Sequence, residues 1–376
     1  MRARTLLVAA LILTACGPLS STAGAKASPS PTPSQKRSTP TPGGGGPGAG
    51  GPYAIVVSPL QAAGQPFTLS LIDAAGKAVA SASGTTRQSG PTCRLGPDQA
   101  ALVVPSPVIV SASDSKVYFE DGDGSVKAFG RDGKVSTVGK LSFGVNSAAV
   151  FAVSPDDSRI AVVTIDASAQ PFKIALSVGP LQSLPGTQIY STTDRSYSLW
   201  PVGWHADQVV VARVPACTQG GGPFTGFPVE YHVVDAQTAA RTATIGALDG
   251  CRTVSLPSPA GALCEDTRTQ RLNLLGWDGR AQSSWADPGL FQYAVSPAGW
   301  GLACCEGQNG PLLLNPSGAT STIAAAQGSI GWIDGTHFLV VGQGPQGQSV
   351  LYDTSSKKTT PVAVSGTYLG RLPGGE

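Results

Sequence analysis

Short apolar segments separated by polar turns fill the chain from residue 53 onward. In one recurring piece a Ser-Pro turn separates two apolar segments, and three copies of it are Phe151–Val163, Val254–Cys264 and Tyr293–Cys305. Two more copies, Val202–Val211 and Ile330–Val341, carry tryptophan in place of the serine. Apolar runs of this length bounded by turn residues predict β-strands joined in pairs.

A second recurring piece is an apolar segment that ends in a turn rich in Asp, Asn or Gly. Its copies are Leu71–Lys77, Phe129–Lys134, Val234–Thr238, Gly276–Arg280, Leu314–Gly318 and Tyr352–Lys357. These residue types are the ones that tight hairpin turns require. Because the two pieces alternate, each unit is predicted to hold four antiparallel strands, a to d, with a period of roughly 37 to 59 residues, typical of propeller blades.

Six such units are complete, and they begin near Val108, Ala148, Tyr197, Cys251, Phe291 and Ser329. A seventh has segments for strands b, c and d at Tyr53–Ser58, Phe67–Asp73 and Lys77–Ser83, but no chain upstream for strand a. Thr367–Leu372 is a spare strand at the other end. We therefore predict an all-β fold, a single β-propeller over residues 53–376 with seven blades, closed by the C-terminal strand. Six blades would result if one unit is misassigned.

The turn Ser154-Pro155-Asp156-Asp157 resembles the Ser-Pro-Asp-Gly turn of the TolB-like family of bacterial β-propellers. The second motif of that family, Asp-x-x-Thr-Gly-Lys, is intact in no copy. The resemblance covers residues 53–374 as architecture and implies a propeller. It implies no particular activity, because propellers serve as enzymes, receptors and scaffolds.

The N-terminus has the pattern of an export signal. Arg2 and Arg4 precede the apolar stretch Leu6–Leu13, which is too short to span a bilayer. The residues Leu13-Thr14-Ala15-Cys16 resemble the bacterial lipobox, which implies that residues 1–15 are a signal peptide, that cleavage occurs before Cys16, and that Cys16 is lipidated. We expect a protein held by lipid at the outer side of the cell membrane, where acyl chains on one cysteine give a stable anchor.

Residues 16–52 are predicted to form a disordered linker. After Leu19 they contain no long aliphatic side chain, and Lys26, Lys36 and Arg37 are their only charges. Such a Ser/Thr/Pro/Gly-rich segment cannot bury a core. At about 3 Å per residue it could extend to roughly 100 Å, which suits a domain held clear of the membrane.

Charge excludes some partners. The chain has 25 Lys and Arg against 23 Asp and Glu, and removal of residues 1–15 takes away two arginines, leaving 23 against 23. A chain with this balance does not attract nucleic acid or an anionic surface through bulk charge. We expect a monomer that binds no nucleic acid and contacts the membrane only through its lipid.

Six cysteines remain after Cys16, in a compartment that permits disulfides. Cys217 lies in a b-to-c loop, and Cys251 follows strand d of the same blade. Both connections lie at the same end of a blade, so Cys217 and Cys251 are one predicted disulfide. Cys264 and either Cys304 or Cys305 occupy matching strands of consecutive blades and form the other candidate, with unpaired buried thiols as the alternative. No spacing typical of a metal site accompanies them.

Motifs for catalysis are missing from the sequence. It has three histidines and neither H-E-x-x-H nor G-x-S-x-G. His205 and His337, beside Trp204 and Trp332, could line a sugar or metal site, but a packing position repeated in two blades explains them better. We therefore expect no catalytic residues, no metal and no cofactor. The preferred function is a non-catalytic binding or scaffolding module; the alternative is a propeller enzyme of lyase, glycosidase or quinoprotein type, with its site at the central channel.

The expected binding face carries the long loops. All b-to-c loops and d-to-a connections lie on one face of a propeller, and the irregular insertions Gly84–Pro107, Ala167–Pro171 and Pro215–Pro228 all belong to these classes. Long loops on a rigid scaffold are common binding sites. Phe224 and Phe227 lie in a loop with little core to bury them, so we predict that they contact a protein or glycan ligand. Neutral insertion is the alternative, because lengthening a loop costs little.

Overall fold

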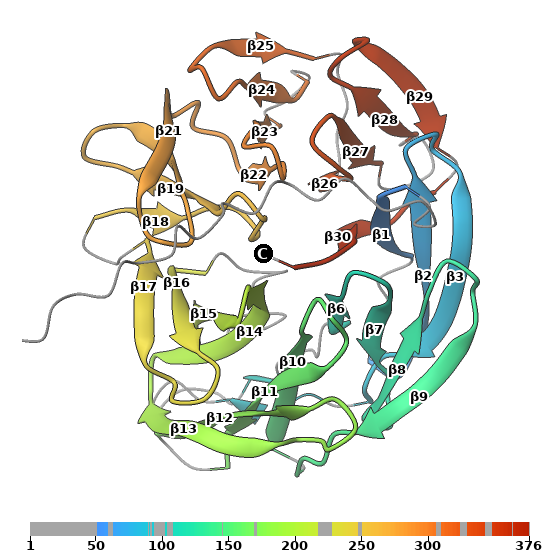
Figure 1. The fold of residues 1–376 in the computed structure, drawn as a ribbon, viewed down its shortest axis with the longest axis vertical. Helices are drawn as coiled ribbons and strands as arrows, with labels where there is room; N and C mark the ends of the chain where they lie inside the picture. The colour runs from blue at the N-terminus through green and yellow to red at the C-terminus, as the bar shows by residue number, and fades with distance from the viewer. Residues whose placement is uncertain are drawn as a thin grey trace, which may run out of the picture. The chain divides into compact units, whose positions relative to one another are not determined.

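Antiparallel β-strands make up all the regular structure of the described residues (Figure 1). The computed structural model describes residues 51–58, 63–88, 90, 92–93, 102–103, 108–144, 146–168, 171–216, 228–246, 250–305, 310–323, 329–342, 348–362 and 364–375. They belong to one compact unit, Gly50–Glu376. The predicted signal peptide, the lipidation site Cys16, the linker up to residue 50, and Cys217, Phe224 and Phe227 lie outside the described residues.

The strands form seven four-stranded sheets, which we number as blades in chain order. Blade 1 contains β30 (Thr367–Leu372), β1 (Tyr53–Ser58), β2 (Pro66–Asp73) and β3 (Ala78–Thr85); blade 2 contains β6 (Val110–Ala112), β7 (Val117–Glu120), β8 (Ser125–Phe129) and β9 (Val135–Lys140); blade 3 contains β10 (Ser147–Val153), β11 (Arg159–Asp166), β12 (Phe172–Pro180) and β13 (Thr187–Asp194); blade 4 contains β14 (Tyr197–His205), β15 (Gln208–Pro215), β16 (Glu230–Asp235) and β17 (Arg241–Ile245).

Blade 5 contains β18 (Arg252–Thr253), β19 (Ala262–Asp266), β20 (Arg271–Leu275) and β21 (Ala281–Ala286); blade 6 contains β22 (Gln292–Val295), β23 (Gly301–Cys304), β24 (Leu312–Leu314) and β25 (Thr320–Thr322); blade 7 contains β26 (Ser329–Trp332), β27 (His337–Val341), β28 (Ser349–Asp353) and β29 (Lys358–Val362). A separate two-stranded sheet pairs β4 (Thr92–Cys93) with β5 (Leu102–Val103). The predicted fold, an all-β propeller of seven blades, is confirmed.

The C-terminal strand closes the ring, as predicted. Strand β30 is the innermost strand of blade 1 and runs antiparallel to β1, with Tyr53 opposite Leu372 and Val57 opposite Thr367 (Figure 1). The inner edge of β1 therefore pairs with β30, which comes from the other end of the domain sequence. Without β30, the backbone N–H and C=O groups along this edge would lack strand partners.

The Ser-Pro turns are stabilised by the serine side chain. In blade 3, Ser154 Oγ accepts a hydrogen bond from the backbone N–H of Arg159 at 2.9 Å and donates to Asp156 Oδ1 at 2.6 Å. In blade 6, Ser296 Oγ accepts from the backbone N–H groups of Ala298 and Trp300 at 3.1 and 3.0 Å. Local hydrogen bonds of this kind explain why serine recurs at the start of the turn.

Tryptophan at the same turn position packs in the core. Trp204 is fully buried and its Nε1–H donates to the carbonyl of Ala152 in blade 3 at 3.0 Å, which ties two blades together. Trp332 packs edge-to-face against Phe338, with 5.2 Å between ring centroids. His205 and His337 lie in different blades, and within the described ranges no three potential metal ligands cluster. The packing interpretation of this position therefore holds for the tryptophans.

Disulfides join cysteines within single blades. Cys251 is bonded to Cys264, with 5.4 Å between Cα atoms, and Cys304 to Cys305, with 3.1 Å. Both differ from the predicted pairings, Cys217 with Cys251 and Cys264 with Cys304 or Cys305. The antiparallel register of β18 and β19 places Thr253 opposite Cys264, so Cys251 is two residues from the position opposite its partner. The prediction relied on two loops at the same end of one blade and on matching strands of consecutive blades, and did not consider the pairing between the adjacent strands β18 and β19.

Candidate functional site

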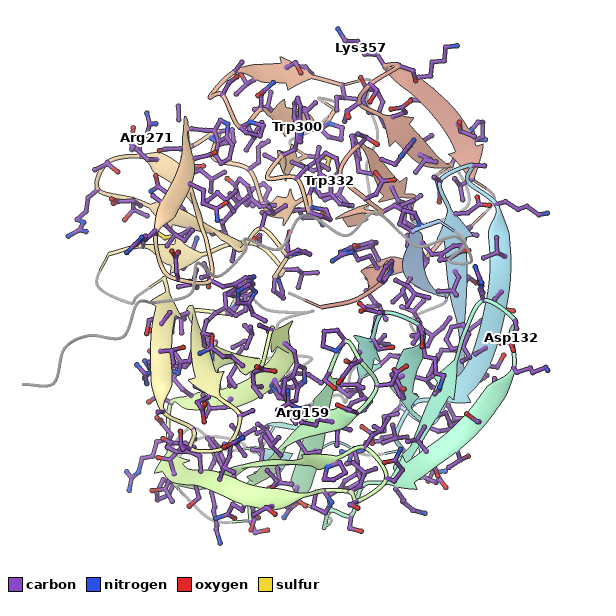
Figure 2. All side chains as sticks on the ribbon, viewed as in Figure 1. Asp132, Arg159, Arg271, Trp300, Trp332 and Lys357 are labelled. Carbon is purple, nitrogen blue, oxygen red and sulfur yellow. A yellow bond between two sulfur atoms is a disulfide. The ribbon has the colours of Figure 1, made fainter. Side chains whose placement is uncertain are left out.

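The central channel of the ring holds a small, largely apolar pocket of about 80 Å³. Its walls come mainly from inner strands, including Val110, Val202, Val295 and Trp332 (Figure 2 shows Trp332 on the inner side of blade 7). Arg371 is the charged residue among the described residues that line it, and none of these is a carboxylate or an imidazole. Tyr368 also lines the pocket, and its hydroxyl donates a hydrogen bond to the carbonyl of Trp332 at 2.7 Å.

A larger pocket of about 390 Å³ lies between the facing sheets of blades 3 and 4. We call it the interblade pocket. Strands β12 and β13 form one wall, and β14 to β17 with the β16–β17 turn form the other. Its volume falls within the range of small-molecule sites, about 300 to 1,000 Å³. Regular strands rather than loops supply most of its described lining, so its shape is built into the scaffold.

Three charged or polar side chains meet in the wall of this pocket. Glu230 Oε1 lies 2.7 Å from His232 Nε2 and 3.2 Å from Arg213 Nη1. Glu230 and His232 are two residues apart on β16 and therefore share one face of the sheet. Arg213 lies directly opposite Glu230 in the β15–β16 register. The pairing of two adjacent strands thus brings the carboxylate, the imidazole and the guanidinium together.

The charges in this cluster follow from its burial and hydrogen bonds. Burial opposes ionisation of Glu230, but hydrogen bonds from His232 and Arg213 outweigh it and lower the pKa of the carboxyl. Burial lowers the pKa of His232, although its hydrogen bond to Glu230 works against this. At neutral pH we therefore expect an ionised carboxylate beside a neutral imidazole. Because an ionised carboxylate can only accept, the Nε2 of His232 must carry the proton, and its Nδ1 is an acceptor.

The strand that enters blade 4 completes the wall. Asp194 Oδ1 accepts hydrogen bonds from the backbone N–H groups of Ser196 and Tyr197 at 2.8 and 3.1 Å, which holds the connection between the blades. The Arg213 guanidinium lies over the Tyr197 ring, 3.8 Å from its centroid. Ser198 is 7% exposed, and its buried Oγ makes no hydrogen bond. A serine nucleophile would need a base within hydrogen-bond reach, so no such pair is formed.

The predicted ligand contacts Phe224 and Phe227 lie outside the described residues and remain a prediction. The segment that carries them, residues 217–227, begins after Ala216 and ends before Pro228. The strands on either side of it are β15 and β16, which contribute Arg213, Glu230 and His232 to the interblade pocket. The sequence analysis missed these three residues. Their one signal is the polar alternation of Glu230 and His232 in an otherwise apolar strand.

Comparison with known proteins supplies no family. No protein-family model and no curated protein matches the chain. Solved structures with similar architecture include apo AztD from Citrobacter koseri, at 13% identity and a TM-score of 0.44, covering 85% of this chain and 97% of that one. BamB from Moraxella catarrhalis is similar at 11% identity and a TM-score of 0.40, covering 82% and 96%. An oligogalacturonate lyase in complex with manganese is similar at 9% identity and a TM-score of 0.46, covering 83% and 96%. Similarity this distant assigns no function.

Proposed function

We propose that the chain is a lipid-anchored, extracytoplasmic propeller of TolB-like type that acts as a non-catalytic binding module, with its ligand in the interblade pocket. The observation that carries the proposal is the cluster of Arg213, Glu230 and His232. Glu230 is hydrogen-bonded to both Arg213 and His232, and all three lie on paired strands, so the pocket is preorganised for a ligand. In this pocket the Glu230 carboxylate and the His232 imidazole are hydrogen-bonded to each other, and the buried Ser198 hydroxyl makes no hydrogen bond to a base, which favours binding over catalysis.

The location is supported by the sequence. The lipobox-like residues ending at Cys16 favour an anchor on the outer side of the membrane, and the linker that follows is long enough to hold the propeller away from it. Within the part of the chain that the structure describes, no helix is long and apolar enough to cross a bilayer. We propose the lipid on Cys16 as the membrane attachment.

The test is recovery of a ligand in unchanged form. The purified mature lipoprotein is incubated with a cell-envelope extract, washed, and denatured, and the released small molecules are identified by mass spectrometry. We expect a compound that is retained by the wild type and by Phe291→Ala, which alters an exposed side chain of blade 6, and that is lost with Arg241→Gln in the pocket. A compound that is chemically converted during incubation would refute the non-catalytic function. Equal retention by Arg241→Gln would refute the site.

A further inference from the structure

The interblade pocket has balanced charge. Two cationic side chains, Arg213 and Arg241, and two anionic ones, Asp194 and Glu230, line it, and His232 is held neutral by burial. An anionic ligand would meet both carboxylates, and a cationic ligand both guanidinium groups. Like charges at close range repel each other and weaken binding. The lining therefore disfavours a ligand with net charge.

An apolar ligand is also disfavoured. The polar groups of the wall would lose water without gaining a partner, which is unfavourable for each group left unsatisfied. Ser198 Oγ is already buried without a hydrogen bond. A ligand that suits this wall must offer both donors and acceptors at short spacing.

Part of the wall is apolar or aromatic. Ile174, Leu176, Leu199 and Val211 contribute aliphatic surface. Tyr190 on β13 is 41% exposed, and among the described residues the other large hydrophobic side chains with exposure this high are Val135 and Phe291. A half-exposed ring at the edge of a polar pocket suits a ligand with a C–H face as well as polar edges.

We propose that the interblade pocket binds a neutral saccharide. Each sugar hydroxyl both donates and accepts, so it can pair with a carboxylate and with a guanidinium or serine hydroxyl at once. Adjacent hydroxyls match the paired atoms of the planar carboxylate and guanidinium groups, and the C–H face of the ring can pack on Tyr190. This inference rests on the proposed function, because it names the ligand class of the same site.

The test measures saccharide binding by the detergent-solubilised mature lipoprotein. Isothermal titration calorimetry and saturation-transfer NMR are run with a panel of neutral mono-, di- and oligosaccharides, and with glucuronate and glucosamine as charged analogues of glucose. We expect a neutral sugar to bind and its charged analogues to bind more weakly. Ser198→Ala should weaken binding about 5-fold, the loss of one hydrogen bond, and Tyr190→Ala by a similar factor.

Controls separate binding from folding. Ser198→Ala removes an unpaired hydroxyl, so its melting temperature should not fall, and Phe291→Ala should leave affinity unchanged. Failure of every neutral saccharide to bind would overturn the proposal, and so would wild-type affinity in both Ser198→Ala and Tyr190→Ala. Preferential binding of glucuronate or glucosamine would also overturn it while the proposed binding function stands. A substrate that is turned over would instead contradict the proposed function itself.

Discussion

Deletion of residues 366–376 tests how the ring is closed. This change removes β30, the innermost strand of blade 1 and the partner of the inner edge of β1. It also removes two buried side chains, Leu369 and Leu372, which are 8% and 4% exposed. The Tyr368 ring lies against Gly331 of blade 7, and its hydroxyl donates to the carbonyl of Trp332 at 2.7 Å. The strand therefore holds blade 7 as well as blade 1.

The expected loss of stability is large. Burial of each leucine contributes about 1.5–3 kcal/mol, and the tyrosine hydrogen bond about 1 kcal/mol. The free energy of unfolding should therefore fall by about 4–7 kcal/mol, a large share of the 5–15 kcal/mol typical of a folded domain. At about 2 °C per kcal/mol for a large domain, the melting temperature should fall by about 10 °C or more, measured by circular dichroism during heating.

Two controls make this prediction specific. Deletion of residues 374–376 removes the backbone hydrogen bond from Gly374 to Ser113 but leaves β30 in place, so it should lower the melting temperature by only a few degrees. A synthetic peptide of residues 364–376, added to the longer truncation, should restore stability, whereas a scrambled peptide should not. A long truncation that melts within a degree or two of the full-length protein would refute closure by β30.

Three further predictions concern the anchor, the loop and a buried ion pair. Cys16→Ser should release the protein from the membrane fraction or leave an uncleaved precursor; processed protein that stays in the membrane would contradict the lipobox assignment. Phe224→Ser with Phe227→Ser should reduce ligand recovery without changing the melting temperature, and a lower melting temperature would mean that the rings are core. Burial raises the pKa of Glu120 to about 7, although Arg87, 2.6 Å away, limits the rise. A raised pKa means that the folded state holds the proton more tightly than the unfolded state, so the free energy of unfolding should fall, by about 3 kcal/mol at most, as pH rises from about 4.5 to 8. Denaturant titrations at several pH values should show this slope in the wild type and not in Glu120→Gln, and parallel profiles would exclude Glu120 as its source.

The repeat pattern predicted the fold because each blade repeats the same local chemistry. Serine at the a-to-b turn and Asp, Asn or Gly at the c-to-d turn mark the ends of strands whatever surrounds them. Ile160 to Val163 of β11 are fully buried, and a run of adjacent apolar residues predicts this burial on both faces. The C-terminal strand β30 could likewise be assigned, because the first blade was the one unit that lacked its strand a. Blade number and closure follow from counting such local signals.

The pocket residues could not be predicted in the same way, because they come together through register between strands that the segment 217–227 separates. Arg213 and Glu230 are adjacent only once β15 and β16 pair with these two residues opposite each other. A shift of one residue would turn Glu230 and His232 to the other face. The cysteine predictions had the same weakness, since Cys251 and Cys264 meet through the register of β18 and β19.

The cluster of Arg213, Glu230 and His232 lies on the paired strands β15 and β16, which makes the site rigid before a ligand binds. Side chains on β15 and β16 are fixed by the ladder between these strands and by the blades on either side, so they need little ordering when a ligand binds. In a site built on a flexible loop, the loop would lose conformational entropy each time a ligand binds. If the segment 217–227 also contacts the ligand through Phe224 and Phe227, its replacement by a Gly/Ser linker should slow association or lower affinity while the preference for neutral over charged ligands persists. Loss of that preference would show that the loop, and not the strand-borne cluster, selects the ligand.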